Sequence, residues 1–274
     1  AGGPEGAVAA PLGGGGFAAA WQDGSRVLLR RFGRSCQASG DEVEVFRSEG
    51  FWEQPGSSGV SDAATLAGGS VAVAWILGGE VSVRVVRAGG ALVPPGAPAA
   101  ASGNRSGSRA EARVHPLDFD GGFAVVWSSW GQDGDGWGVF ARLFGADATP
   151  ISQEVQVNDQ WRQFQWHPQL TTCAGSLWVL WTNSSGSGCG SQCDTGPLLR
   201  QLAANSSCPS GVAASREAPS KEGAAPLAAA LACQGSSASA VAFALERGSV
   251  EGTLAVERSS FAAAPAEALP CLPA

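Results

Sequence analysis

A repeat of roughly fifty residues constrains the fold of this chain more than any other feature. Each copy centres on a short apolar run that follows glycine or serine and ends in an aromatic residue. The run recurs five times, ending at Trp21, Trp75, Trp127, Trp181 and Phe243. Short apolar runs bounded by turn residues are typical of strands. Self-similarity at this period is typical of folds built from repeated sheets.

Each copy carries further strand-like segments around its aromatic run. The segments before it span residues 7–12, 62–66, 113–117, 167–171 and 225–231. Those after it span 27–32, 81–86, 139–144, 198–202 and 253–256, and a fourth strand is clear at 42–46 and 154–157. In the second copy the corresponding place is proline-rich, at 93–98, which suits an edge strand or a loop because proline cannot sit in a central ladder.

Four short antiparallel strands per repeat have the dimensions of a propeller blade. We therefore predict one all-β repeat domain, a five-bladed β-propeller of four-stranded antiparallel blades. The approximate blades are 5–50, 60–100, 111–158, 165–217 and 223–262. A β-sandwich or an open β-repeat array is the alternative. The last copy lacks a clear fourth strand, so either the residues before Ala7 close the ring or the chain is a piece of a larger array.

The third copy carries the fullest motif, in residues 121–127, 131–136, 139–144 and 153–158. It reads Gly-Gly-Phe-Ala-Val-Val-Trp, then Gln-Asp-Gly, then a strand ending in Phe, then Val-Asn. This order resembles a tandem β-repeat of large secreted and cell-surface proteins. The resemblance implies an extracellular, β-rich array without enzymatic activity. Leu143 stands where the repeat usually has arginine, and the other copies lack the Gln-Asp-Gly turn.

Charge and the length of the apolar runs argue against two features, nucleic-acid binding and a membrane-spanning helix. Only 15% of the residues are charged and the net charge is −7, so bulk charge would not hold a phosphate backbone and nucleic acid is not expected. No apolar run reaches the roughly 18 residues of a membrane-spanning helix. The chain contains no methionine, which indicates a processed product or a fragment of a longer protein.

Cysteines and glycosylation sequons indicate an oxidising, secretory compartment. The sequons begin at Asn104, Asn183 and Asn205. Seven cysteines allow at most three internal bridges and leave one thiol over. The disulfide candidates lie in the fourth copy, with their connectivity open: Cys173, Cys189, Cys193 and Cys208.

Two possible metal sites are weak. Asp133 and Asp135 alternate with glycine as in a calcium loop, but calcium needs six to eight oxygen ligands, so a hairpin turn is the better interpretation. His115 and His167 begin equivalent strands of different repeats and have no third ligand, so zinc is not expected. No cofactor is predicted, apart from this weak possibility of calcium.

Four arginines fall at similar positions of the strand after the aromatic run: Arg30, Arg84, Arg142 and Arg200. One interpretation is structural, because a charge between packed sheets must be paired with a carboxylate or with carbonyl groups. The other is a ring of guanidinium groups that binds an anion or a partner.

Four tryptophans in or near loops form the last group of candidates: Trp130, Trp137, Trp161 and Trp166. Exposed aromatic rings there would suit sugar stacking or a protein contact. Packing between blades is the alternative.

These observations predict a secreted, non-catalytic module that binds other subunits of an extracellular or lumenal assembly. A carbohydrate-binding or glycosidase-like propeller is the alternative function, with glycans as ligands. A glycosidase needs two carboxylates about 5–10 Å apart. The acidic cluster that could supply them consists of residues with the character of turns: Asp118, Asp120, Asp133, Asp135 and Asp159.

Overall fold

The computed structural model describes most of the chain. The described residues are 5–49, 59–103, 107–118, 121–159, 162, 164–173, 175–184, 196–210, 212–214, 218–219, 228–234, 237–245, 254–262 and 269–273. The chain divides into two compact units, Ala1–Val125 with Arg142–Ile151, and Val126–Ala141 with Ser152–Ala274. No helix in these ranges is long and apolar enough to cross a membrane.

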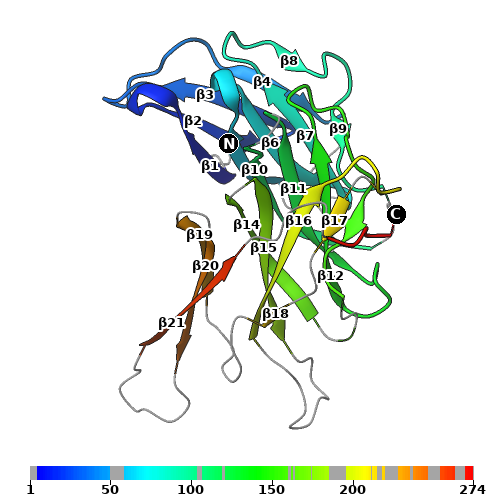
Figure 1. Ribbon diagram of the computed structural model, residues 1–274. Coiled ribbons are helices and arrows are strands. Elements are labelled where there is room, and N and C mark those ends of the chain that lie inside the picture. Colours follow the sequence, from blue (N-terminus) through cyan, green and yellow to red (C-terminus); the bar gives the residue numbers. More distant parts are fainter. Residues whose placement is uncertain are drawn as a thin grey trace. The chain divides into compact units, whose positions relative to one another are not determined.

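Within the described residues, the strands form five antiparallel sheets that follow one another along the chain (Figure 1). The first has the order β1 (Glu5–Pro11), β2 (Phe17–Asp23), β3 (Arg26–Phe32) and β4 (Val43–Arg47). The second has the order β5 (Gly59–Thr65), β6 (Val71–Leu77), β7 (Glu80–Val86) and β8 (Leu92–Val93), and β9 (Ala99–Ala100) also pairs with β7. Single 3₁₀ turns, Gly13–Gly15 and Ala67–Gly69, connect the first two strands of these sheets.

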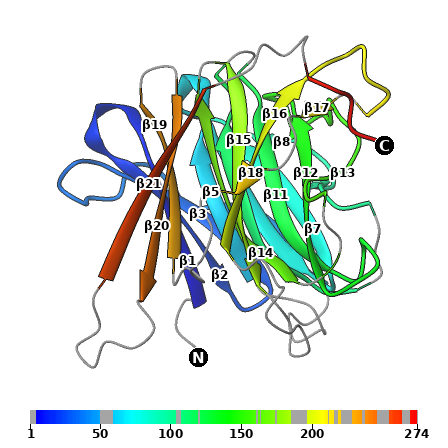
Figure 2. The ribbon, with the colours of Figure 1, turned by 60° about the horizontal axis from the view of Figure 1, so that its bottom comes forward.

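The third sheet has the order β10 (Arg109–Pro116), β11 (Phe123–Trp130), β12 (Trp137–Phe144) and β13 (Val155–Gln156). The fourth has the order β14 (Phe164–Cys173), β15 (Ser176–Ser184), β16 (Gly196–Ala204) and β17 (Val212–Ala214), with β18 (Ala218–Pro219) on β16. The described part of the fifth holds β19 (Ala228–Gln234), β20 (Ser237–Leu245) and β21 (Leu254–Ala262), which lie side by side in Figure 2.

The predicted all-β class, with antiparallel sheets of the propeller-blade type, is confirmed. The outer part of the second sheet consists of two short strands, β8 and β9, on either side of the proline-rich segment. Prolines remove ladder donors there, so a long fourth strand cannot form.

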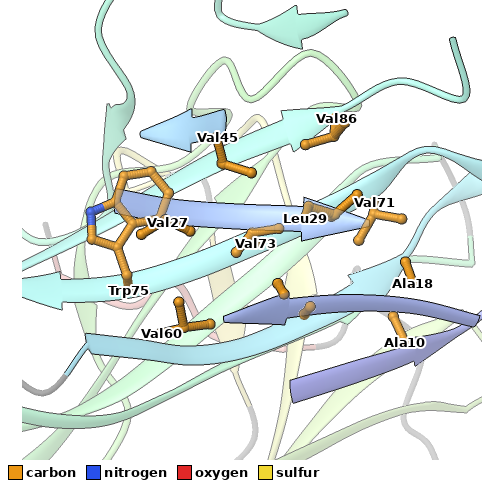
Figure 3. Packing of buried hydrophobic residues seen from close by; sticks show 12 residues of the cluster. Ala10, Ala18, Val27, Leu29, Val45, Val60, Val71, Val73, Trp75 and Val86 are labelled. Atoms are coloured by element: carbon orange, nitrogen blue, oxygen red, sulfur yellow. The ribbon is translucent and has the colours of Figure 1, made fainter. Parts of the chain in front are cut away.

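The central strands of the second sheet bury both faces, unlike a sheet that faces water on one side. In β6 every residue from Val71 to Ile76 is buried, and in β7 every residue from Val81 to Val86 is buried. Side chains from the first and second sheets form one apolar cluster, in which Val27, Val45 and Val73 lie close to Trp75 (Figure 3). The Trp75 ring is fully buried and stacks on Phe46 with the ring centroids 5.1 Å apart.

The first strands β1, β5 and β10 contact one another in that order, and side chains cap their free edges. The Thr65 hydroxyl on β5 donates to the Pro11 carbonyl on β1. The Asp62 carboxylate on β5 accepts the Val114 N–H of β10 at 2.9 Å. These bonds satisfy backbone groups that an edge strand otherwise leaves unpaired.

The contribution of the Asp62 carboxyl group to the stability of the first unit should increase in mild acid. Burial raises its pKa above the ordinary value of 3.8, although the N–H groups of Val114 and Ala63 and the charge of Arg113 oppose the shift. The folded chain therefore takes up this proton at a higher pH than the unfolded chain, so the contribution of Asp62 to the free energy of unfolding rises as the pH falls through the folded pKa.

We expect the free energy of unfolding of wild type, relative to that of Asp62→Asn, to increase as the pH falls from 7 to 4. Urea unfolding of both proteins at several pH values measures it. A difference that stays constant over this range would contradict the prediction.

The residues at 269–273 extend the outer edge of the fourth sheet. Leu272 N–H donates to the Val212 carbonyl, and Ala214 N–H donates to the Pro270 carbonyl, each at 2.9 Å. A disulfide between Cys208 and Cys271 links this segment covalently to the connection between β16 and β17.

Candidate functional site

Five aromatic rings form a continuous row in the second unit, which we call the aromatic row. It comprises Trp137, Trp130, Phe164, Trp166 and His167. Neighbouring ring centroids along it are 5.5, 5.6, 6.2 and 5.0 Å apart. The Trp130 side chain is 45% exposed, an unusual state for a large apolar ring in a folded domain.

The first two rings flank the hairpin turn between β11 and β12. Trp130 ends β11, Trp137 begins β12, and their rings meet edge to face at 76°. Gly131, Gly134 and Gly136 all have positive φ, which glycine adopts without steric cost. The glycine spacing therefore produces the tight turn that brings the two tryptophans together.

The other three rings belong to β14, where a bulge changes the direction of the side chains. Phe164 and Trp166 are two residues apart and so share a face of the strand. The register then shifts between Trp166 and Gln169, and His167 has a φ of 55°. Adjacent residues of a regular strand point to opposite faces, but here the Trp166 and His167 rings lie 5.0 Å apart.

The Asp133 carboxylate holds the hairpin turn through two hydrogen bonds. One carboxylate oxygen accepts the Asn158 amide N–H at 3.0 Å, and the other accepts the Asp135 N–H at 3.3 Å. The carboxylate lies against Gly138, where an added Cβ would come within 2.5 Å of Oδ2. Burial raises the pKa of Asp133, and the charge of Asp135 adds to the shift. Both oxygens thus face N–H donors, as in a structural turn.

Asn158 connects this turn to the fourth sheet. Its side-chain N–H groups reach Asp133 and, at 3.2 Å, the Gln165 Oε1, while its Oδ1 accepts the Val139 N–H at 2.8 Å. Gln165 in turn donates to the Asn183 Oδ1 at 3.2 Å. Asn158, Gln165 and Asn183 are all nearly inaccessible to solvent. We call them the amide chain; a satisfied buried network of this kind holds its elements in one arrangement.

Polar groups border the exposed end of the row. Gln132, in the turn, accepts a hydrogen bond from the Ser129 hydroxyl at 2.8 Å and donates one to the Glu154 carboxylate. Asp135 lies exposed between the two tryptophans in sequence. The site therefore combines an exposed aromatic surface with amide and carboxylate groups. In the described part of the chain, no three histidine, cysteine, aspartate or glutamate side chains converge as a metal site would require.

Three of the four aligned arginines donate hydrogen bonds to backbone carbonyls. Arg84 donates to the Val45 carbonyl at 2.9 Å, Arg142 to the Ala100 carbonyl at 3.2 Å, and Arg200 to the Val157 carbonyl. Each acceptor belongs to the outer part of the preceding sheet. Arg200 also pairs with Asp159 at 2.8 Å. We call Arg84, Arg142 and Arg200 the arginine staples, and we place them outside the candidate site because their guanidinium groups bind the main chain.

Arg30 occupies the same register in the first sheet. Its Nε is buried and finds no hydrogen-bond acceptor within the described ranges. It lies on β3 of the first unit, whereas the aromatic row belongs to the second unit. Arg30 therefore does not join the candidate site.

The structure pairs one predicted disulfide cysteine with a residue outside the predicted set. Cys208, one of the predicted candidates, bonds to Cys271, which lies outside the fourth repeat. Cys173 is also disulfide-bonded. Cys36 is free and exposed. The other predicted candidates, Cys189 and Cys193, lie outside the described residues.

The three sequons have different settings. Asn205 is partly exposed, and its Oδ1 accepts the Ser207 N–H at 3.0 Å. Asn183 is only 2% exposed and belongs to the amide chain, so a glycan there would have to displace this packing. Asn104 lies outside the described residues, as do Trp161 and Asp120.

Sequence reasoning found Trp130, Trp137 and Trp166 but missed Phe164 and His167 as their neighbours. The alternation of Phe164 and Trp166 was a usable signal, because residues two apart share a face of a strand. The position of His167 depends on a bulge, and the equivalent places in the first and second sheets hold glycine, at Gly6 and Gly59. The amide chain joins residues of separate strands, so spacing along the sequence did not predict it.

Comparisons with known proteins place the chain in no family. No family model matches, and a search of curated proteins finds no match. Among solved structures, an endo-arabinase from Bacteroides thetaiotaomicron matches with 10% identity over 92% of this chain and 90% of that chain, at a TM-score of 0.43. An α-L-arabinofuranosidase from Lactobacillus brevis matches with 10% identity over 93% and 89%, at 0.44. The GH43 BlXynB protein from Bacillus licheniformis matches with 11% identity over 97% and 57%, at 0.46.

The prediction that the chain is not an enzyme is contradicted by this comparison. The prediction assigned no enzymatic activity to the chain, whereas the arabinase and the arabinofuranosidase are enzymes. The prediction is withdrawn. At TM-scores below 0.5, the likeness assigns no reaction or substrate to this chain.

Proposed function

We propose that this protein binds carbohydrate through the aromatic row. The observation that carries the proposal is the 45% exposure of Trp130 within a row of packed rings. A tryptophan that only filled space between sheets would be buried, as Trp127 and Trp181 are. The exposed ring is therefore available to a ligand.

A sugar fits the chemistry of this surface. A pyranose or furanose ring has an apolar face of C–H groups and a rim of hydroxyl groups. The apolar face packs on an aromatic ring, and the hydroxyls need hydrogen-bond partners at its border. Gln132, Glu154 and Asp135 supply amide and carboxylate groups at this border.

The site is also held in place before a ligand arrives. Asp133 ties the hairpin turn to Asn158, and Asn158 ties it to Gln165 on the strand that carries Phe164 and Trp166. A preorganised surface loses less conformational entropy on binding, which raises affinity. A secreted protein that meets glycans outside the cell agrees with the Cys208–Cys271 disulfide and with the resemblance of the third repeat to extracellular β-repeats.

Replacing Trp130 with alanine should lower the affinity for a bound glycan at least tenfold, as expected when an aromatic anchor of about 1.4 kcal/mol or more is removed. A glycan array identifies the ligand, and isothermal titration calorimetry measures the affinities. Trp130→Phe should lose less than Trp130→Ala. Ile151→Ala is the matched control, because Ile151 is the other exposed large apolar side chain in the described residues, at 42%, and lies in the first unit.

Equal affinities for wild type and Trp130→Ala would contradict the proposal, as would the absence of wild-type binding across the array. The same incubations should be examined for released sugars, because turnover would extend the proposal from binding to hydrolysis. The earlier prediction of partner subunits stays a prediction. It would replace this proposal if Trp130→Ala abolished capture of a protein partner but left glycan binding intact.

A further inference from the structure

We infer that the ligand of the aromatic row is a linear, neutral oligosaccharide that occupies several rings at once, with Trp166 and His167 at the far end. This inference rests on the proposed function and specifies its substrate class. A single exposed tryptophan would be enough to bind one sugar unit. Here the exposed ring continues into a series of rings.

The geometry of the row supports several contiguous subsites. Successive centroids are separated by 5.0–6.2 Å, and each ring contacts the next. Trp130 and His167 are exposed, and Trp137, Phe164 and Trp166 are partly exposed. The rings come from three strands, β11, β12 and β14. A continuous apolar strip of this kind matches a chain of sugar rings better than a compact monosaccharide.

The backbone at His167 extends the row. His167 has a left-handed φ of 55°, which is unfavourable for a residue with a Cβ. Its effect is to place the His167 ring on the same side of β14 as Trp166, with the rings 30° apart in plane. Positive φ recurs in the first strands of the other sheets, at Gly6, Gly59 and Glu111. The bulge therefore belongs to the repeat, and in the fourth sheet it carries an aromatic ring.

The charged side chains near the row in sequence are mostly acidic. Asp135 lies exposed in the hairpin turn, and Glu154 bonds to Gln132 of that turn. Arg162 is an exposed basic residue two positions before Phe164. Asp159 follows Asn158 with its side chain 47% exposed. Arg200 beside it is already paired with Asp159 at 2.8 Å and with the Val157 carbonyl, and its side chain is 6% exposed. Fixed negative charge next to a ligand repels uronic acids and sulfated sugars, whereas uncharged hydroxyl groups can donate to carboxylates.

The test compares ligand lengths in wild type and in two variants. The probes are purified ladders of cello-, xylo- and malto-oligosaccharides, from disaccharide to hexasaccharide, with an oligogalacturonate ladder as the anionic comparison. His167→Gly removes the ring and leaves a residue that adopts positive φ freely, so the fold should persist. Trp130→Ala removes the exposed ring nearest the hairpin turn. Calorimetry gives each affinity.

For one neutral ladder, wild-type affinity should rise with length over several sugar units and then level off. His167→Gly should keep the affinity for the shortest binding member but lose a threefold to tenfold gain on the longest ones. Trp130→Ala should weaken every length. Oligogalacturonates should bind at least tenfold more weakly than the matching neutral chains.

Two results would overturn this inference while leaving the proposed function intact. One is wild-type affinity that does not change with length, and the other is an equal loss at all lengths for His167→Gly. Preferential binding of oligogalacturonate would overturn the assignment to neutral chains. Wild type that binds no ladder and no array glycan would overturn both the inference and the proposed function.

Discussion

Replacing Trp75 with alanine is expected to lower the free energy of unfolding of the first unit by about 3–5 kcal/mol. The Trp75 side chain is fully buried, packs in the cluster with Val27, Val45 and Val73, and stacks on Phe46. Alanine would lose the transfer free energy of the ring and leave a cavity between the first two sheets. Because a domain is stable by only about 5–15 kcal/mol, this loss is a large part of the total.

Urea unfolding, followed by circular dichroism, measures the effect. Trp75→Phe should lose less, since a smaller ring fills part of the space. Trp130→Ala is the matched control, because it removes the same atoms from a side chain that is 45% exposed, and it should cost less than half as much. Similar losses at Trp75 and Trp130 would show that the cluster in Figure 3 does not support the first unit.

Arg84→Met is expected to cost about 2–4 kcal/mol, because it leaves the buried Val45 carbonyl without its donor and removes the bonds to the more exposed Pro94 and Gly96 carbonyls. The Arg84 side chain lies 7% exposed, and its guanidinium group binds the carbonyls of Val45, Pro94 and Gly96. Methionine keeps most of the apolar stem, so the loss isolates the hydrogen bonds. Arg84→Lys should recover only part of it, since an ammonium group cannot reproduce the planar fork of donors.

Arg87→Met is the control for this variant, because Arg87 is exposed one residue after the same strand and its substitution should change stability by less than about 0.5 kcal/mol. Thermal and urea unfolding of the three variants give the comparison. Equal stabilities of Arg84→Met and Arg87→Met would mean that solvent satisfies the freed carbonyls, and the structural interpretation of the arginine staples would fail.

The sheets were predictable because their signal is periodic. The run from Val71 to Trp75 repeats the run that ends at Trp127, and both form the second strand of a sheet. Burial on both faces removes the alternation of polar and apolar residues, so the repeat itself was the stronger guide. The aligned arginines left two interpretations open, a structural pairing and an anion-binding ring, and three of them donate to backbone carbonyls in the structure.

The candidate site was less predictable because it depends on contacts across strands. Trp130 and Trp137 were found through their shared turn. The bond from Asn158 to Gln165 depends on how β14 lies beside the third repeat, which no local spacing encodes. Cys271 was missed as the partner of Cys208 because 63 residues separate them.

The arginine staples have a consequence for how such a chain can grow by gene duplication. Each staple reaches backward to a carbonyl of the preceding sheet, and a carbonyl needs no particular side chain. A duplicated repeat therefore contains the arginine that donates to the preceding repeat. It also contains the backbone carbonyl that accepts from the arginine of the following repeat. Side chains elsewhere in a repeat can diverge while this junction persists, which explains how repeats with little mutual identity can stack in one polypeptide.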